Sequence, residues 1–199
     1  MTPALWLASA SSARADLLRR AGVPVEIEPA RIDEDEVKAS MRAEKAMAEM
    51  VAETLAEMKA SRVARRHPGA LVIGADQMLS SGDRWYDKPA NLAEARAHLQ
   101  SLRGRQHTLI SALCVVRNDT RIWHHREYAR MTMRDFSETF LDDYLAQSGP
   151  EVLESVGAYR LEGLGIQLFQ RIEGEYTTIL GLPLLPLLDF LRGHGVVKT

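Results

Sequence analysis

The chain contains 199 residues, of which 46% are hydrophobic and 26% are charged, and its formal net charge is −2. A chain of this length suits one domain and can bury about 70% of the surface that it exposes when unfolded. The near balance of charge excludes a general electrostatic attraction to nucleic acid or anionic lipid. We therefore expect a single domain, residues 1–199, that meets any anionic partner at a local site.

Cysteine usage and hydropathy bear on the compartment. Cys114 is the only cysteine, so no intramolecular disulfide can form, which fits a reducing environment. The first residues lack the basic segment and apolar core of a signal peptide, and the sequence has no 18-residue apolar stretch. We therefore expect a soluble, cytoplasmic protein.

A hydroxyl-rich turn, residues 9–12, separates a predicted strand at residues 4–8 from a predicted helix at residues 13–21. Hydroxyls and free backbone N–H groups at a helix N-terminus can hold a phosphate without a glycine-rich loop. Arg14 favours this interpretation, because a cation in the first helical turn opposes the helix dipole unless an anionic ligand offsets it. Without such a ligand the serines would be capping residues.

A strand, an acidic run and a long helix are predicted next. Residues 25–29 alternate as a strand. The acidic run at residues 33–36 indicates solvated charge, although one member can reach a divalent cation. Apolar residues recur at roughly helical spacing from residue 43 to residue 66 and predict one helix. Lys59 lies at the edge of this apolar stripe, where its ammonium is either exposed or turned toward a site.

A short apolar run, residues 71–73, predicts a buried strand that ends near Asp76, and Gly74 lets the backbone pass close to another element. Residues 87–89 then supply Lys88, which the following proline holds extended. A carboxylate and an ammonium near one turn can hold a metal-bound phosphate, with the carboxylate on the cation or on a water and the lysine on phosphate oxygens. The same residues also fit an ordinary surface ion pair.

The second half of the chain predicts further helices and one hairpin. Helices are predicted at residues 92–102, 137–145 and 184–191, and an antiparallel hairpin at residues 107–117 and 121–133. Three glycines within residues 157–165 predict a tight loop, which is either a ligand lid or an ordinary turn.

Each of these signals is weak alone, but their order resembles the Maf family of nucleoside triphosphate pyrophosphatases, also called septum-formation-inhibitor proteins. The resemblance runs from about residue 5 to residue 193. It is carried by Leu7-Ala-Ser-Ala-Ser11 with Arg14 and Leu17-Leu18, Ile32-Asp33-Glu34, Lys59-Ala60, Ile73-Gly-Ala-Asp76, Lys88-Pro89, Gly157-Ala-Tyr159, Glu162-Gly163-Leu164-Gly165 and Gly181-Leu-Pro183.

The resemblance implies a mixed α/β fold, with a central sheet flanked by helices and a cleft between two lobes, similar to Maf and ITPase proteins. It also implies hydrolysis of a nucleoside triphosphate to the monophosphate and pyrophosphate with a divalent metal cation, Mg²⁺, Mn²⁺ or Co²⁺. The protein would be a homodimer that cleans nucleotide pools or acts in cell division.

The same resemblance implies a set of site residues. Asp76 would be the catalytic carboxylate and proton acceptor, and Glu34 would hold the metal together with Asp76. The phosphate site would consist of Ser9, Arg14, Lys59 and Lys88.

Three further positions bear on the choice of base. Ser12 and Ala13 stand where the family usually has a Pro-Arg pair, so one cation of the phosphate loop is missing. Gln77 and Glu162 resemble the branch that acts on 7-methyl-GTP, whereas the pyrimidine-preferring branch usually has Thr and Gln there. The 7-methyl-GTP branch, however, tends to carry an aromatic residue at the position of Ala13.

Hydrogen-bonding capacity favours a guanine-type base at these positions. An ionised Glu162 only accepts hydrogen bonds, so it pairs best with the N1–H and N2–H₂ donors of guanine, whereas uracil and thymine offer one N–H between two carbonyls. Gln77 donates as well as accepts, and we expect it to meet guanine O6. The sequence thus predicts a preference for guanine-type triphosphates, including 7-methyl-GTP.

Two other functions fit parts of the sequence. The chain can be a nucleotide-binding regulator of septum formation without strong catalysis, or a pyrophosphatase that prefers dTTP or UTP. Asp76, Lys59 and Lys88 together favour chemistry, because binding alone does not need an acid beside two cations. A nucleic-acid-binding module is disfavoured, since the sequence lacks basic stripes with interleaved aromatic residues.

Overall fold

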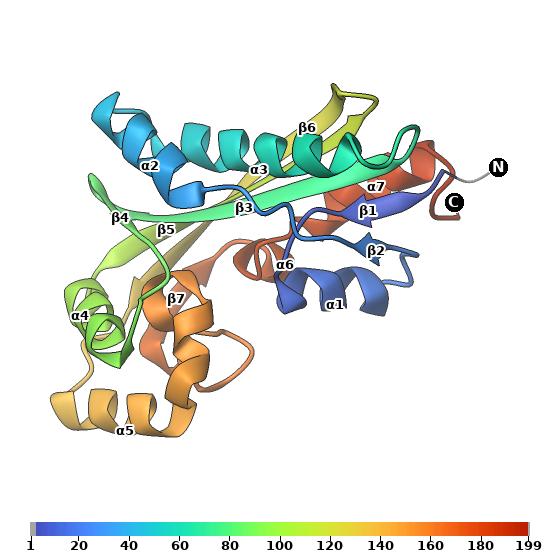
Figure 1. The fold of residues 1–199 in the computed structure, drawn as a ribbon. Helices are drawn as coiled ribbons and strands as arrows, with labels where there is room; N and C mark the ends of the chain where they lie inside the picture. Colours follow the sequence, from blue (N-terminus) through green and yellow to red (C-terminus); the bar gives the residue numbers. More distant parts are fainter. Residues whose placement is uncertain (1–2, 199) are drawn as a thin grey trace. The chain divides into compact units, whose positions relative to one another are not determined.

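The computed structural model describes residues 3–198 and shows a mixed α/β fold (Figure 1). The strands are β1 (Leu5–Leu7), β2 (Glu26–Ile27), β3 (Leu71–Ser81), β4 (Arg84–Tyr86), β5 (Gln106–Arg117), β6 (Thr120–Met133) and β7 (Phe169–Glu173). The helices are α1 (Ser12–Arg20), α2 (Glu34–Ala43), α3 (Ala48–Ala64), α4 (Leu92–Leu102), α5 (Glu138–Ser148), α6 (Tyr176–Ile179) and α7 (Leu184–Gly193), with 3₁₀ turns η1 (Gly149–Glu154), η2 (Val156–Ala158) and η3 (Leu164–Leu168). None of the helices within residues 3–198 is long and apolar enough to cross a membrane.

The strands form one mixed sheet in the order β2-β1-β3-β5-β6-β7, with β4 paired to β3. Strand β1 runs parallel to both of its neighbours, so that Leu7 pairs with Ile27 on one side and with Ile73 on the other. The pairs β3–β4 and β6–β7 are antiparallel. The mixed central sheet expected from the sequence is confirmed.

The chain divides into two compact units. The first contains the residues up to Gln77, residues 110–127 and the residues from Glu175 onward, and the second contains residues 78–109 and 128–174. Strands β3, β5 and β6 contribute residues to both units. Each unit is described by itself below.

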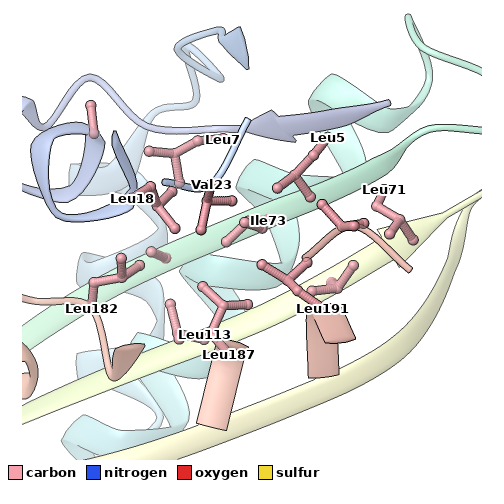
Figure 2. Close-up of a cluster of buried hydrophobic side chains, with 14 residues drawn as sticks. Leu5, Leu7, Leu18, Val23, Leu71, Ile73, Leu113, Leu182, Leu187 and Leu191 are labelled. Atoms are coloured by element: carbon pink, nitrogen blue, oxygen red, sulfur yellow. The ribbon is translucent and has the colours of Figure 1, made fainter. Parts of the chain in front are cut away.

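The first unit is built around an apolar cluster between the sheet and two helices. Figure 2 shows leucines of β1, β3 and β5 directed toward leucines of α1 and α7, among them Leu7, Leu113, Leu18 and Leu187. These four side chains are at most 1% exposed, and burial of apolar area is the main favourable contribution to folding. The cluster fixes the end of β1 and the start of α1 against β3.

Helix α3 packs on β3 at Gly74, where the two backbones come into close contact. A Cβ atom at Gly74 would lie 1.9 Å from the carbonyl oxygen of Ala56 and 2.9 Å from the Cβ atom of Ala60. The close approach that the sequence predicts at Gly74 is therefore confirmed, and the neighbouring element is α3. Asp76 follows Gly74 by two residues on β3, so its side chain lies on the same face of the strand and also faces α3.

The structure corrects the predictions for residues 43–66 and adds a helix start at the acidic run. The long helix expected over residues 43–66 starts later, as α3 at Ala48, because residue 43 ends α2 and Lys45, between the two helices, adopts a left-handed conformation with φ of 57° that no helix can continue through. The acidic run starts α2, where Asp33 accepts the backbone N–H of Glu36 at 3.0 Å and carboxylates suit the helix dipole. Met47, expected to face inward, is 60% exposed.

The second unit confirms the local predictions closely. Helix α4 is capped by Asn91 and α5 by Ser137, each side-chain oxygen accepting a backbone N–H of the first turn. In the core of the second unit His107 and Tyr159 share a hydrogen bond of 2.8 Å, and burial lowers the pKa of His107 to about 4. The predicted hairpin is confirmed as well: β5 and β6 are joined by a turn through Asn118 and Asp119, which belong to the first unit and are both at positive φ.

A methyl group at Gly74 tests the packing of α3 on β3. We expect Gly74→Ala to lower the free energy of unfolding by about 3 kcal/mol, because the new Cβ overlaps the Ala56 carbonyl and α3 must move. Gly193→Ala is the control, since a Cβ there meets nothing within 4 Å, and we expect a change within about 1 kcal/mol. Urea denaturation of both variants measures the difference, and equal stability would contradict the contact.

Candidate active site

The turn between β1 and α1 holds a buried arginine. Arg14 is 9% exposed, and its Nη1 donates to the hydroxyl of Ser9 at 3.3 Å and to the carbonyl of Ala75 at 3.0 Å. Its Nε donates to the carbonyl of Gly181 at 2.9 Å. Burial lowers the pKa of Arg14, and the negative charges of nearby carboxylates counteract this effect. A guanidinium held by neutral oxygens keeps its charge available for an anion.

The serines of this turn support the arginine and the helix start. Ser11 caps α1 by accepting the backbone N–H of Arg14 at 3.4 Å, and Ser9, which is 6% exposed, accepts the N–H of Ser11 at 3.2 Å. Ala13 lies half-buried in the first turn of α1. Ser9 therefore helps to orient Arg14, the cation of the predicted anion-binding turn.

Asp76 and Lys59 form a buried ion pair in the first unit. Asp76 is 4% exposed and Lys59 is 7% exposed, and Lys59 Nζ lies 2.6 Å from Asp76 Oδ1. The same Nζ lies 2.8 Å from Oε1 of Glu34, at the start of α2, whose side chain is 40% exposed. Lys59 thus bridges the two carboxylates. The prediction that Asp76 ends a strand is wrong, because β3 continues to Ser81.

The second oxygen of Asp76 distinguishes this pair from a purely structural one. Oδ2 is buried and has no hydrogen-bond partner within the described part of the chain. Burial raises the pKa of Asp76, while the charges of Lys59 and Arg14 lower it. A buried acceptor without a partner is costly, and such atoms occur where a water, an ion or a ligand is expected.

Asp76 and Glu34 also fit a divalent cation. No group of three or more His, Cys, Asp or Glu side chains that could hold a metal is found within residues 3–198. Mg²⁺ does not need such a group, because it is usually bound by one or two carboxylates, waters and substrate phosphates. The unpartnered Asp76 Oδ2 and the half-exposed Glu34 supply that donor set.

Gln77 is half-buried, and its amide nitrogen is surrounded by acceptors. Nε2 donates to the hydroxyl of Ser111 at 2.9 Å and to the carbonyls of Ile179 and Thr178 at 3.0 and 3.1 Å. The donor predicted to meet guanine O6 is therefore already engaged. This geometry does not support that part of the prediction.

Lys88 and Glu162 belong to the second unit. Lys88 is exposed and follows β4. Glu162 lies beside η3, and its Oε1 accepts Arg160 Nε at 3.2 Å, while Arg160 Nη1 contacts Glu151 Oε2 at 2.6 Å. A cavity of about 280 Å³ in this unit is lined by Tyr144, Gln147, Ser148, Glu151, Val152, Arg160, Glu162, Gly163, Leu164 and Gly165.

The structure brings five of the predicted site residues together in the first unit. They are Ser9 and Arg14, joined by a hydrogen bond, and Glu34, Lys59 and Asp76, joined by ion pairs, and the charge of Arg14 interacts with both carboxylates. Sequence reasoning missed the supporting role of Ser111 and of Gly181. Ser111 is a polar residue inside the apolar run 109–116, and this interruption was the signal available in the sequence.

The sequence of the chain matches a known protein family and several known proteins. The model of the Maf family, described as Maf-like protein, matches residues 4–194. The chain belongs to the Maf family. The nucleoside triphosphate pyrophosphatase of Paramagnetospirillum magneticum is 58% identical over 95% of this chain and 97% of that protein. The 7-methyl-GTP pyrophosphatase of Rhizobium meliloti is 52% identical over the full length of both.

Among solved structures, a HAM1 protein from Coxiella burnetii gives a TM-score of 0.43 at 15% identity, covering 67% of this chain and 74% of that chain.

The buried ion pair of this Maf chain can be tested through stability. Lys59→Met keeps most of the side-chain volume but leaves the Asp76 carboxylate buried without its cation. We expect a loss of about 3 kcal/mol in the free energy of unfolding at pH 7, measured by urea denaturation. Lys45→Met removes an exposed lysine and should change stability by less than about 0.5 kcal/mol. Similar values for the two variants would show that the pair is not a buried one.

Proposed function

We propose that this chain hydrolyses nucleoside triphosphates to nucleoside monophosphate and pyrophosphate. The observation that carries the proposal is the buried Asp76 carboxylate, with Lys59 on one oxygen and no partner among residues 3–198 on the other. The membership of the Maf family and the names of its close relatives support the same reaction. A screen of nucleoside triphosphates with Mg²⁺, Mn²⁺ and Co²⁺ that reads pyrophosphate release tests it.

The cations of the site suit a triphosphate. Arg14 offers a fixed guanidinium, and Lys59 offers an ammonium that a phosphate oxygen can draw away from Glu34, the more exposed of its two partners. Lys88 is the further phosphate-binding residue that we propose. Such cations stabilise the charge that develops on the equatorial and leaving oxygens during phosphoryl transfer.

Asp76 is the group that we propose to take a proton from the attacking water. Its unpartnered Oδ2 can accept a hydrogen bond from that water, and burial raises its pKa, which makes the carboxylate a stronger base than an exposed one. Lys59 and Arg14 oppose that rise and keep the ionised form populated. Attack at the α-phosphorus then releases pyrophosphate.

A divalent cation would be held by Asp76 and Glu34 together with phosphate oxygens. When bound, it supplies neutralisation of phosphate charge and polarisation of a water. The residues of the chain orient the triphosphate and accept the proton. The homodimer and the cytoplasmic location that the resemblance implies stay predictions.

The base is the least constrained part of the proposal. We propose that Glu162 accepts hydrogen bonds from a guanine-type base, 7-methylguanine included, through Oε2, since Arg160 takes Oε1. Ala13 and Gln77 are the other proposed specificity positions. A relative named 7-methyl-GTP pyrophosphatase is consistent with this choice. There are two alternatives: an enzyme that prefers dTTP or UTP, and a regulator that binds nucleotide without catalysis.

Removing the charge of Asp76 distinguishes the enzyme from the regulator. We expect Asp76→Asn to lower kcat at least a hundredfold while the dissociation constant for a nucleoside triphosphate changes much less, because an amide keeps the shape but cannot accept the proton. Isothermal titration and pyrophosphate release measure the two quantities. A loss in kcat of less than tenfold would contradict the role of Asp76, and a wild-type protein that binds nucleotide but releases no pyrophosphate would favour the regulator.

Replacing Glu162 tests the base preference. We expect wild-type kcat/KM to be higher for GTP and 7-methyl-GTP than for UTP and dTTP, and Glu162→Gln to narrow the gap about tenfold, because the amide also donates and so tolerates a carbonyl. Glu151→Gln is the matched control on the other side of Arg160 and should keep the ranking. A wild-type preference for UTP or dTTP would overturn the assignment of Glu162.

A further inference from the structure

Three helices of the first unit, within the described residues 3–198, end in the same kind of cap. At the end of α6, the N–H of Gly181 donates to the carbonyl of Thr178 at 3.0 Å, and the N–H of the next residue donates to the carbonyl of Thr177 at 2.9 Å. Two such bonds around a left-handed glycine form the Schellman motif. The same pattern ends α1 at Gly22 and α7 at Gly195.

The cap by itself accounts for all three glycines. Gly22, Gly181 and Gly195 have φ of +71°, +84° and +69°, a left-handed conformation that glycine adopts without strain. The residue that follows each glycine is apolar and buried in the core of the first unit: Val23, Leu182 and Val196. If the caps had no other role, the same substitution at each glycine would have the same effect.

Gly181 differs from the other two glycines in what lies against it. Its carbonyl oxygen, which the two bonds of the cap do not use, accepts Nε of Arg14 at 2.9 Å. A Cβ atom at Gly181 would lie 3.1 Å from Nη2 and 3.2 Å from Nε of Arg14, closer than ordinary van der Waals contact. A Cβ atom at Gly22 or Gly195 meets nothing within 4 Å. Residue 181 therefore leaves room for the guanidinium because it has no side chain.

The guanidinium of Arg14 is also tied to β3. Nη1 donates to the carbonyl of Ala75, the residue before Asp76, at 3.0 Å, and to the hydroxyl of Ser9 at 3.3 Å. These partners and Gly181 all belong to the first unit. Because a guanidinium is planar and its N–H directions are fixed, two main-chain carbonyls on different nitrogens set its orientation relative to Asp76. Neither carbonyl neutralises its charge.

We propose that Gly181 is a positioning residue for triphosphate binding: its carbonyl, held by the cap of α6, orients Arg14, and its missing side chain makes room for the guanidinium. This inference rests on the proposed function, because it assigns Arg14 to the phosphates of that substrate. A guanidinium recognises the charge of phosphates and carries no information about the base. Displacing it should therefore weaken the binding of any chain of phosphates, with or without a nucleoside.

Inorganic tripolyphosphate tests this role without a base or a sugar. We expect Gly181→Ala to weaken its binding about tenfold in isothermal titration, because the new Cβ displaces the guanidinium. Gly181→Asn should weaken binding by a similar factor, since asparagine tolerates the left-handed conformation but also adds a Cβ. Gly195→Ala and Gly195→Asn are the matched controls, and binding to them should stay within about twofold of wild type.

Stability and a mutant cycle separate backbone strain from the contact with Arg14. Gly195→Ala should lower the melting temperature by about 2–4 °C and Gly181→Ala by at least as much, because both force an L side chain into the left-handed region. Only Gly181→Ala should also lose affinity for tripolyphosphate. In the Arg14→Ala background Gly181→Ala should have no further effect on that affinity, because it acts through Arg14.

Hydrogen exchange at Arg14 gives a readout that a purely structural cap would not change. In the ¹⁵N-labelled protein, the Nε–H signal of Arg14, assigned by its loss in Arg14→Lys, should exchange slowly with solvent. We expect exchange about tenfold faster in Gly181→Ala and unchanged in Gly195→Ala, because the Nε–H of Arg14 donates to the carbonyl of Gly181.

Three results would overturn the proposal. They are a wild-type protein that does not bind tripolyphosphate, binding within about twofold of wild type in both Gly181 variants, and an equal effect of Gly181→Ala with and without the Arg14 side chain. A wild-type protein that binds tripolyphosphate but releases pyrophosphate from no nucleoside triphosphate would instead overturn the proposed function. The binding and exchange measurements would then still decide whether Gly181 positions Arg14.

Discussion

The buried contact between Lys59 Nζ and Asp76 Oδ1 is the interaction on which the site depends. Taking two charges out of water is costly, and replacing such a pair by apolar residues often leaves a protein equally or more stable. Stability therefore does not explain why the pair is buried. The close approach of α3 to β3 at Gly74 places it there, and the result is a carboxylate with one oxygen held and one oxygen unpartnered.

The support for this site comes from distant parts of the chain. Arg14 reaches the pair's neighbourhood from the first helix, yet it is held by the carbonyl of Gly181 near the C-terminal end. Ser111, in the middle of the sequence, holds Gln77. Because hydrogen bonds to main-chain carbonyls leave little freedom, the side chains of Arg14 and Gln77 are oriented before any ligand arrives.

Local signals predicted the elements whose ends are set by one residue. Asn91 and Ser137 cap their helices through their own side chains, and Asn118 with Asp119 adopts the positive φ of a tight hairpin. The geometry of a helix cap or a tight turn depends on neighbouring residues alone, so it can be predicted from the sequence. The acidic run did not predict a helix start, because carboxylates suit both solvent and a helix N-terminus. The interruption between α2 and α3 at Lys45 could not be predicted either, because no glycine or proline marks it.

The sequence alone did not predict which charged and polar side chains are buried. Lys59 sits in the core-facing stripe of α3 because Asp76 and Glu34 meet it there, and neither contact is local. Met47 and Met50 point outward although they are apolar. The ordered motifs did identify Asp76, Lys59 and Arg14 as one site, but which oxygen of Asp76 is held, and that the amide nitrogen of Gln77 is engaged, are properties of the folded chain.

The most direct test of the account is a double-mutant cycle on kcat with saturating nucleoside triphosphate, using Asp76→Asn, Lys59→Met and the two together. If the ion pair works as a unit, the double variant loses clearly less kcat than the product of the two single losses, because in Asp76→Asn the ammonium of Lys59 no longer has the Asp76 carboxylate to orient and keeps only its contacts with Glu34 and the phosphates. Losses that multiply in the double variant would show that the two residues act independently, and would contradict the pair as the centre of the reaction.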